Sequence, residues 1–109
     1  LEDAAKVLIE QEKAMQIHKK RHPEKIFTFD YDSFVNSPEA KLETLLEWLG
    51  LEFHKSYLHP ENSTRSINTA SVVQARKPIS NKSVGGWKNY QKLLKPAIRI
   101  LQGGGIPID

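Results

Sequence analysis

The chain has 109 residues, of which 39% are hydrophobic and 27% charged, with no cysteine and a formal net charge of +3. This composition is typical of one modest globular domain, and it excludes a disulfide framework and any thiolate metal site. No apolar run is long enough for a membrane-spanning helix, and the lack of cysteine favours the cytoplasm.

The N-terminal third predicts a helix followed by a short strand. Residues 1–20 lack Gly and Pro, and their apolar residues recur at helical spacing. The residues predicted to share one helical face are Leu1, Ala4, Ala5, Leu8 and Met15. Pro23 closes this helix, and the aromatic, β-branched stretch "KIFTFDY" (25–31) is typical of a short, mostly buried strand.

Residues 36–50, "NSPEAKLETLLEWLG", carry the clearest helix pattern of the chain. Ser37 can cap the helix, Pro38 suits its first position, and Gly50 can take the left-handed conformation that ends it. Leucines at i, i+3, i+4 and i+7 form the apolar face that this helix would bury.

The C-terminal half predicts shorter helical pieces. "HKSYL" (54–58) and "TASVVQAR" (69–76) each fit a short helix, the second capped by Thr69 and ended by Pro78. A last amphipathic helix follows, and Pro96 should kink it or begin a second helix. The residues predicted to share its apolar face are Trp87, Tyr90 and Leu94.

These elements predict a mainly helical domain with one short strand over residues 1–102, and a flexible tail over residues 103–109. One strand cannot form a sheet by itself. Either the fold is essentially helical, or the strand belongs to a sheet whose other strands lie outside this chain. In the second case the chain is a piece of an α/β enzyme.

Charge is distributed unevenly along the chain. Residues 1–60 contain 8 Lys/Arg and 11 Asp/Glu, whereas residues 61–109 contain 8 and 2. No acidic residue stands between Glu61 and Asp109. Such a block favours an anionic partner such as phosphate, sulfate or nucleic acid, and the alternative is a solvated basic face.

Within this block, "TASVVQARKPISNKSVGGWKNY" (69–90) combines cations, hydroxyls and a Gly-Gly pair before a predicted helix. Charge-assisted donors, glycine backbone and a helix N-terminus are the groups that hold phosphate-like anions. The nucleotide pattern GxxxxGK[ST] is absent. His18 and His22 are spaced as zinc ligands can be but lack the Glu of HExxH, so no metal site is predicted.

Two segments together resemble sulfotransferases. "FTFDYDSFVNSPEAKLETLLEWLGLEF" (27–53) resembles their "Y-E-D-L-V…P…LL.FLGL" segment, and residues 69–96 resemble the segment that follows it. The resemblance is closest to bacterial-type enzymes, often fused to tetratricopeptide repeats, and to tyrosylprotein sulfotransferases. "KSVGGWKNY" (82–90) is also similar to the "GxxGDWKN" loop of cytosolic sulfotransferases.

The resemblance implies that the chain is the C-terminal portion of an α/β sulfotransferase fold, which is related to the P-loop folds. It implies transfer of a sulfuryl group from 3′-phosphoadenosine-5′-phosphosulfate to an acceptor hydroxyl or amine. By the same resemblance, the residues that bind the adenosine-3′-phosphate half of this donor are Tyr31, Ser71, Gln74, Arg76, Lys77 and Ser80.

Two departures from the family pattern bear on activity. Gly86 stands where relatives place a basic residue or Asp, and Lys82 or Lys88 is the candidate replacement. The "PKSGTT"-like sulfate-binding loop, the Arg and Ser of the 3′-phosphate motif and the catalytic base have no counterpart here. The isolated chain, which contains no predicted catalytic residue, is therefore expected to be inactive.

Two further interpretations stay open. The chain is alternatively a small basic module that binds nucleic acid or another polyanion. Against this, only Trp87 and Tyr90 supply aromatic rings to the basic half, and both have core-like helical spacing. A homodimer through the exposed strand 25–31 or through the last helix is compatible with either function.

Overall fold

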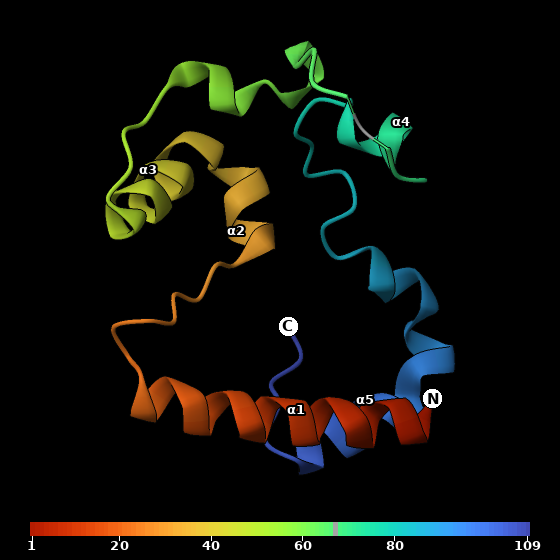
Figure 1. The fold of residues 1–109 in the computed structure, drawn as a ribbon. Helices are drawn as coiled ribbons and strands as arrows, with labels where there is room; N and C mark the ends of the chain where they lie inside the picture. The colour runs from red at the N-terminus through yellow and green to blue at the C-terminus, as the bar shows by residue number, and fades with distance from the viewer. Residues whose placement is uncertain (67) are drawn as a thin grey trace. The chain divides into compact units, whose positions relative to one another are not determined.

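The computed structural model describes residues 1–66 and 68–109. They form two compact units: residues 1–26 with 85–109, here called the helical unit, and residues 27–84, here called the loop-rich unit. The described residues contain five α-helices, three short 3-10 helices and no strand (Figure 1). The prediction of a mainly helical chain is confirmed, and the prediction of a strand is wrong.

The helical unit is built on two helices that pack against each other. α1 (Glu2–Arg21) confirms the helix predicted for residues 1–20, and α5 (Gln91–Gly103) follows the 3-10 helix η3 (Gly86–Tyr90). α1 has acidic residues in its first turn and basic residues in its last turn. Both placements complement the helix dipole, so this helix is favoured by local electrostatics as well as by packing.

The face that α1 buries differs from the predicted one. Ala5 and Ile9 are buried, whereas the predicted face is otherwise exposed, Leu1, Leu8 and Met15 included. At 3.6 residues per turn, the Ala5–Ile9 row lies roughly 80° around the helix from that of the three exposed residues. The buried face of α1 is set by α5, because the two helices pack where the small side chains of Ala5 and Ala97 let them come close.

α5 continues through Pro96, so of the two predicted outcomes the second helix is wrong, and a kink at Pro96 stays a prediction. The change in helix type falls earlier, between η3 and α5, and Tyr90 of the predicted apolar face is exposed. A Schellman motif ends α5: Gly105 has φ 84°, and the Ile106 N–H donates to the Leu101 carbonyl at 2.9 Å. The flexibility of residues 103–109 stays a prediction.

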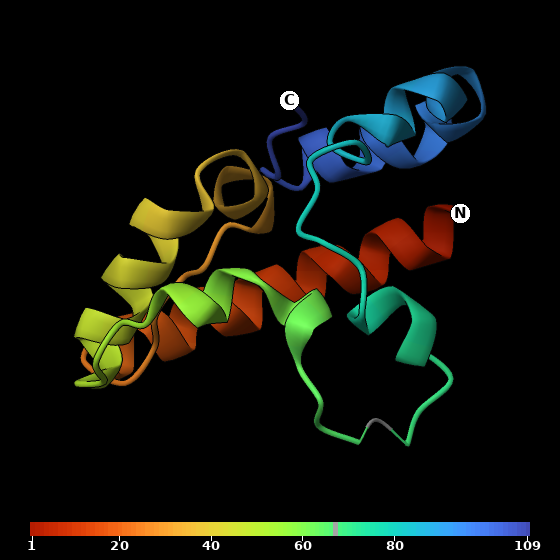
Figure 2. The ribbon, with the colours of Figure 1, turned by 90° about the horizontal axis from the view of Figure 1, so that it is seen from above.

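The loop-rich unit contains α2 (Tyr31–Asn36), α3 (Pro38–Leu49), η1 (Lys55–Leu58), η2 (Pro60–Asn62) and α4 (Val72–Ala75). Figure 2 shows η1 and η2 in green as short turns after α3. α3 confirms the predicted helix, with Pro38 at the first position and Gly50 at φ 70° after the last. Ser37 stands at the N-cap but its side chain makes no capping bond, and on the predicted apolar face Leu46 is buried whereas Leu49 is exposed. The Leu51 N–H donates to the Leu46 carbonyl at 2.8 Å, which makes a second Schellman stop.

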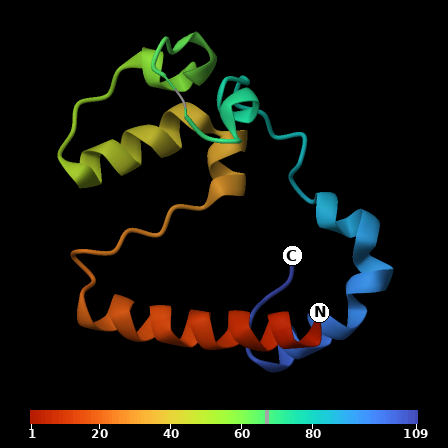
Figure 3. The ribbon, with the colours of Figure 1, turned by 45° about the vertical axis from the view of Figure 1, so that its right-hand side comes forward.

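The segment predicted as a strand leads into α2 instead. Residues 26–30 have no regular secondary structure, and Tyr31 is already helical (Figure 3). Two causes explain the difference. The described residues offer no partner strand for a backbone ladder, and the Asp30 carboxylate caps α2 by accepting from the Ser33 N–H at 3.0 Å.

The aromatic residues of this segment nevertheless pack. The Phe27 ring lies 5.3 Å from the Trp48 ring of α3, and the Phe29 ring lies 5.2 Å from the Phe34 ring of α2. Offset, tilted aromatic pairs at such distances stabilise beyond their buried area. The segment is therefore attached to α2 and α3 through side chains rather than through backbone hydrogen bonds.

Candidate functional site

All six residues predicted to bind the donor lie in the loop-rich unit. Tyr31 is the first residue of α2, and the other five lie between residues 71 and 80, around α4. Ser71, and not the predicted Thr69, stands at the N-cap position of α4, where its side chain makes no capping bond. Its hydroxyl is therefore not used by the helix.

The residues around α4 are brought together by one short helix. Ser71 and Gln74 are three residues apart, so they share a face, and Arg76 and Lys77 follow at the C-terminal end. Ser71 to Lys77 would span about 9 Å along a regular helix axis. The Lys77 N–H donates to the Gln74 carbonyl at 3.1 Å, which extends the turn to Lys77.

The cations of this cluster are solvent-exposed. None of the ion pairs found among the described residues includes Arg76 or Lys77. Neither guanidinium nor ammonium is therefore neutralised by a neighbouring carboxylate within the described chain. Both remain able to form charge-assisted hydrogen bonds to an anion.

One long-range hydrogen bond connects α2 to the end of the basic segment. The Asn81 side-chain amide donates to the Asn36 Oδ1 at 3.1 Å, within the loop-rich unit. Asn36 is the last residue of α2 and Tyr31 the first, so about 7.5 Å of helix rise separates them. Ser80 is the chain neighbour of Asn81, so Tyr31 and Ser80 lie on segments that meet at this bond.

Tyr31 and Ser80 keep polar or aromatic surface available. The Tyr31 side chain is 66% exposed, with its ring 6.3 Å from the Phe34 ring. An exposed ring of this kind can stack on a planar base. The Ser80 Oγ accepts from the Lys82 N–H at 3.2 Å, so Lys82 is held near Ser80, whereas Lys88 belongs to the helical unit.

A cavity of about 350 Å³ lies next to the basic segment but has the opposite charge. None of the six predicted residues lines it. Its carboxylates disfavour an anion on this side of the Lys77–Pro78 peptide. The residues that line it are Pro38, Glu39, Leu58, His59, Glu61, Pro78 and Ile79.

The His59–Glu61 pair in this cavity was missed by sequence reasoning. The His59 Nδ1 lies 3.1 Å from the Glu61 Oε1, and the Glu61 Oε2 is shielded from solvent without a hydrogen-bond partner among the described residues. Its own backbone N–H, and after it His59, hold the pKa of the Glu61 carboxyl below its ordinary value. The available signal was the "HPE" spacing, which places both side chains on one 3-10 turn.

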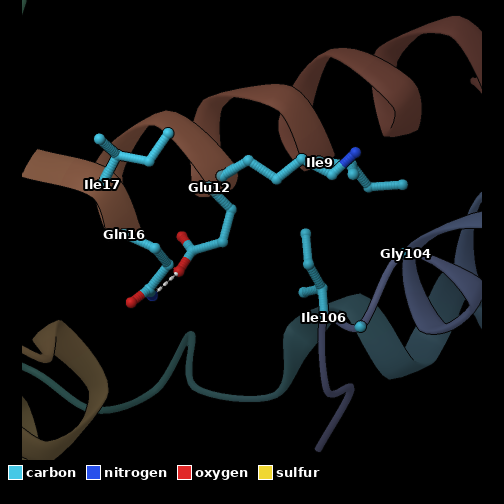
Figure 4. A pocket seen from close by; sticks show the side chains of 8 residues that line it. Ile9, Glu12, Gln16, Ile17, Gly104 and Ile106 are labelled. Atoms are coloured by element: carbon cyan, nitrogen blue, oxygen red, sulfur yellow. Dashed lines mark hydrogen bonds between the residues drawn. The ribbon is translucent and has the colours of Figure 1, made fainter.

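The helical unit contains a larger cavity of about 570 Å³ between α1 and the C-terminal turn (Figure 4). Ile9, Ile17 and Ile106 give it apolar walls, and a hydrogen bond from Gln16 to Glu12 lies at its rim. It holds no convergent set of nucleophile, acid and base. The arrangement offers apolar contact and no evident chemistry.

Within the part of the chain that the structure describes, no group of three or more His, Asp or Glu side chains is placed to hold a metal ion. No described helix combines the length and the apolar character needed to cross a membrane.

No family model matches the sequence, and no solved structure matches it. An uncharacterized protein of Aquifex aeolicus (strain VF5) is 38% identical over 85 residues, which is 78% of this chain. The aligned stretch is 11% of that protein, so the chain spans only a small part of its relative's length.

Proposed function

We propose that the chain is the C-terminal portion of a sulfotransferase and forms part of the pocket for 3′-phosphoadenosine-5′-phosphosulfate. In this proposal Tyr31 contacts the adenosine. Ser71, Gln74, Arg76, Lys77 and Ser80 surround the same half of the donor and hold its 3′-phosphate. The acceptor is a hydroxyl or an amine bound by residues outside this chain.

The hydrogen bond between Asn36 and Asn81 is the observation that carries the proposal. The two sequence segments that resemble sulfotransferases are separated by an irregular connector, and this bond joins the end of α2 to the residue after Ser80. Tyr31 lies about 7.5 Å of helix rise from one end of this bond, and Ser80 is the chain neighbour of the residue at the other end. The bond thus joins the segment that carries Tyr31 to the segment that carries Ser80.

Charge also supports an anionic ligand at this place. The donor carries several negative charges, and the exposed Arg76 and Lys77 have no carboxylate partner among the described residues. Such cations gain more from a phosphate than cations already paired, because no existing ion pair must be broken. Glu39 and Glu61 make the adjoining cavity unfavourable for the same group.

Exposed apolar side chains support the view that the chain is part of a larger domain. The buried apolar residues of the described chain are few, and large ones such as Leu1 and Leu93 are 68% and 71% exposed. Extensive apolar exposure marks surfaces that other elements cover. The sulfate-binding loop and the catalytic base would lie on those elements, so the chain alone should not catalyse sulfuryl transfer.

The test is a calorimetric titration of the chain with adenosine 3′,5′-bisphosphate, with adenosine 5′-monophosphate and with a DNA oligomer. We expect the bisphosphate to bind with a Kd on the order of millimolar or tighter, and in preference to both other ligands. Arg76→Ala should raise the Kd of the bisphosphate about tenfold, since a charge-assisted hydrogen bond is lost. Arg65→Ala removes an exposed arginine of the same unit and serves as the matched control.

Other outcomes would refute the proposal. Tighter, steeply salt-dependent binding to DNA, with equal losses for Arg65→Ala and Arg76→Ala, would instead indicate the basic polyanion-binding module. An absence of binding to all three ligands would reject both functions. Robust sulfuryl transfer by the isolated chain would contradict the placement of the catalytic groups outside it.

A further inference from the structure

Residues 26–29 carry backbone groups that the described chain leaves unsatisfied. Their N–H and C=O groups take part in none of its backbone or side-chain hydrogen bonds. The next carbonyl, of Asp30, is used, because it accepts from the Phe34 N–H at 3.0 Å. Figure 3 shows the segment in orange as an extended stretch leading into α2, and Asp30 itself is extended, with φ −83° and ψ 111°.

Side chains hold one face of this segment in place. Residues two apart lie on the same face of an extended chain. Phe27 and Phe29 are such a pair, and their rings pack on Trp48 and Phe34. Thr28 then points to the opposite face, where it is exposed.

The two edges of the segment are not equivalent. In an extended chain the N–H and C=O groups of alternate residues point to opposite edges. Phe27 and Phe29 therefore present four unused groups on one edge, and Ile26 and Thr28 present four on the other. The edge of Ile26 and Thr28 continues into Asp30, whose carbonyl is already occupied by α2, and Ile26 belongs to the helical unit. The edge of Phe27 and Phe29 lies wholly within the loop-rich unit and is the better placed of the two for pairing.

We propose that this edge pairs with the same edge of a second copy of the chain, antiparallel and about a two-fold axis at Thr28. Phe27 then forms a hydrogen-bonded pair with Phe29 of the second copy, and Phe29 with its Phe27. These two pairs satisfy all four groups on each edge. Thr28 faces Thr28 of the second copy across the axis. The two form a non-hydrogen-bonded pair, the kind of pair in which the side chains approach each other most closely.

The local sequence favours a second copy over other occupants and sets the direction. Residues 26–29 contain no charge, Pro or Gly, and segments of this kind self-associate when exposed. Lys25 and Asp30 stand at opposite ends. An antiparallel pair brings the Lys25 end beside the Asp30 end of the second copy, whereas a parallel pair would bring like charges together. Because the pairing uses one edge of each copy, it closes as a dimer.

The experiment places charge on the two-fold axis. Thr28→Lys sets two ammonium groups opposite each other and should raise the dimer dissociation constant about tenfold in sedimentation equilibrium. Thr28→Asp should do the same, and an equimolar mixture of the two variants should form a heterodimer at least as tight as the unsubstituted dimer. Thr64→Lys adds the same charge elsewhere in the loop-rich unit and should leave association unchanged.

Hydrogen exchange of the unsubstituted chain supplies a second readout. The amides of Phe27 and Phe29 should become protected as protein concentration rises, while the amide of Thr28 stays unprotected. A chain that remains monomeric up to about millimolar concentration would overturn the proposal. So would dimers that tolerate Thr28→Lys, which would point to another surface such as α5. Protection of Thr28 in place of its neighbours would show that the wrong edge was chosen.

Discussion

The two units of the molecule use their sequences differently. In the helical unit, two helices account for most of the residues, and small side chains let them come close. The described residues of the loop-rich unit form one helix of 12 residues and several shorter helical pieces, with caps and aromatic pairs between them. All six predicted donor-binding residues lie in this second unit. We therefore expect stability to depend mainly on close packing in the first unit, and the proposed donor binding to depend on short segments in the second.

The largest effect is expected where the helical unit is packed most closely. A Cβ atom at Gly104 would lie 2.7 Å from Cγ1 and 3.1 Å from Cγ2 of Ile9, so that side chain would have to move as a whole. Gly104→Ala should lower the free energy of unfolding by about 2 kcal/mol in urea denaturation. At Gly103 a Cβ meets nothing within 4 Å, so Gly103→Ala is the matched control and should be neutral or stabilising. Equal stability of the two variants would contradict the close approach.

Two smaller losses of stability, one in each unit, allow the units to be compared directly. Gly50 and Gly105 both end helices in Schellman motifs, with φ values of 70° and 84°, and a Cβ at either position meets nothing within 4 Å. Each change to alanine should therefore cost only the left-handed backbone, about 1 kcal/mol.

The readout is hydrogen exchange, resolved by residue. Gly50→Ala should increase exchange in α3, and Gly105→Ala should increase exchange in α5. Loss of protection throughout the chain in both variants would show that the two units unfold together.

The helix signals that acted locally were readable from the sequence. Pro38 and Gly50 mark the start and the end of α3 as predicted, because the fixed φ of proline and the positive φ of glycine require no distant partner. α1 was likewise recognised from its lack of Gly and Pro. Its buried row was not, since the choice of Ala5 and Ile9 depends on where α5 packs. Pro96 does not begin a second helix, because α5 continues through it.

The strand at residues 25–31 could not be settled from sequence for a different reason. Its residues have strand propensity, but a strand exists only when another backbone pairs with it. Asp30, which lies within the predicted strand, caps a helix instead. For the candidate site, sequence indicated the residue types around α4. The Asn36–Asn81 bond, which connects the residue after Ser80 to α2, joins positions 45 apart, beyond any local pattern.

That bond allows a third prediction, which links fold to site. Asn36→Ala and Asn81→Ala, measured singly and together, should show a coupling of about 0.5–1 kcal/mol, as expected for one solvent-exposed hydrogen bond. Each single variant should also weaken the binding of adenosine 3′,5′-bisphosphate, because the segment after Ser80 is no longer held at α2. Coupling without any change in Kd would confirm the bond and reject its role in positioning the site.

The smallest effect is confined to acidic pH and to the start of the loop-rich unit. The Ser33 backbone N–H, with a smaller contribution from Lys41, holds the pKa of Asp30 below its ordinary value. A carboxyl whose pKa is lower in the folded than in the unfolded chain stabilises the fold above the unfolded pKa of about 4. That contribution is lost as pH falls through the folded pKa.

Asp30→Asn separates the charge from the cap, because asparagine caps a helix almost as well but does not titrate. Stability of the unsubstituted chain should decline more steeply than that of the variant between about pH 6 and 2. Exchange of the α2 amides should show the same difference. Asp30→Ala removes the cap itself and should increase α2 exchange at every pH. Parallel pH profiles for the unsubstituted chain and Asp30→Asn would mean that the Ser33 N–H is not bound to an ionised carboxylate. The segment between Phe27 and α2 would then be held by its aromatic contacts and by the bond from the Phe34 N–H to the Asp30 carbonyl.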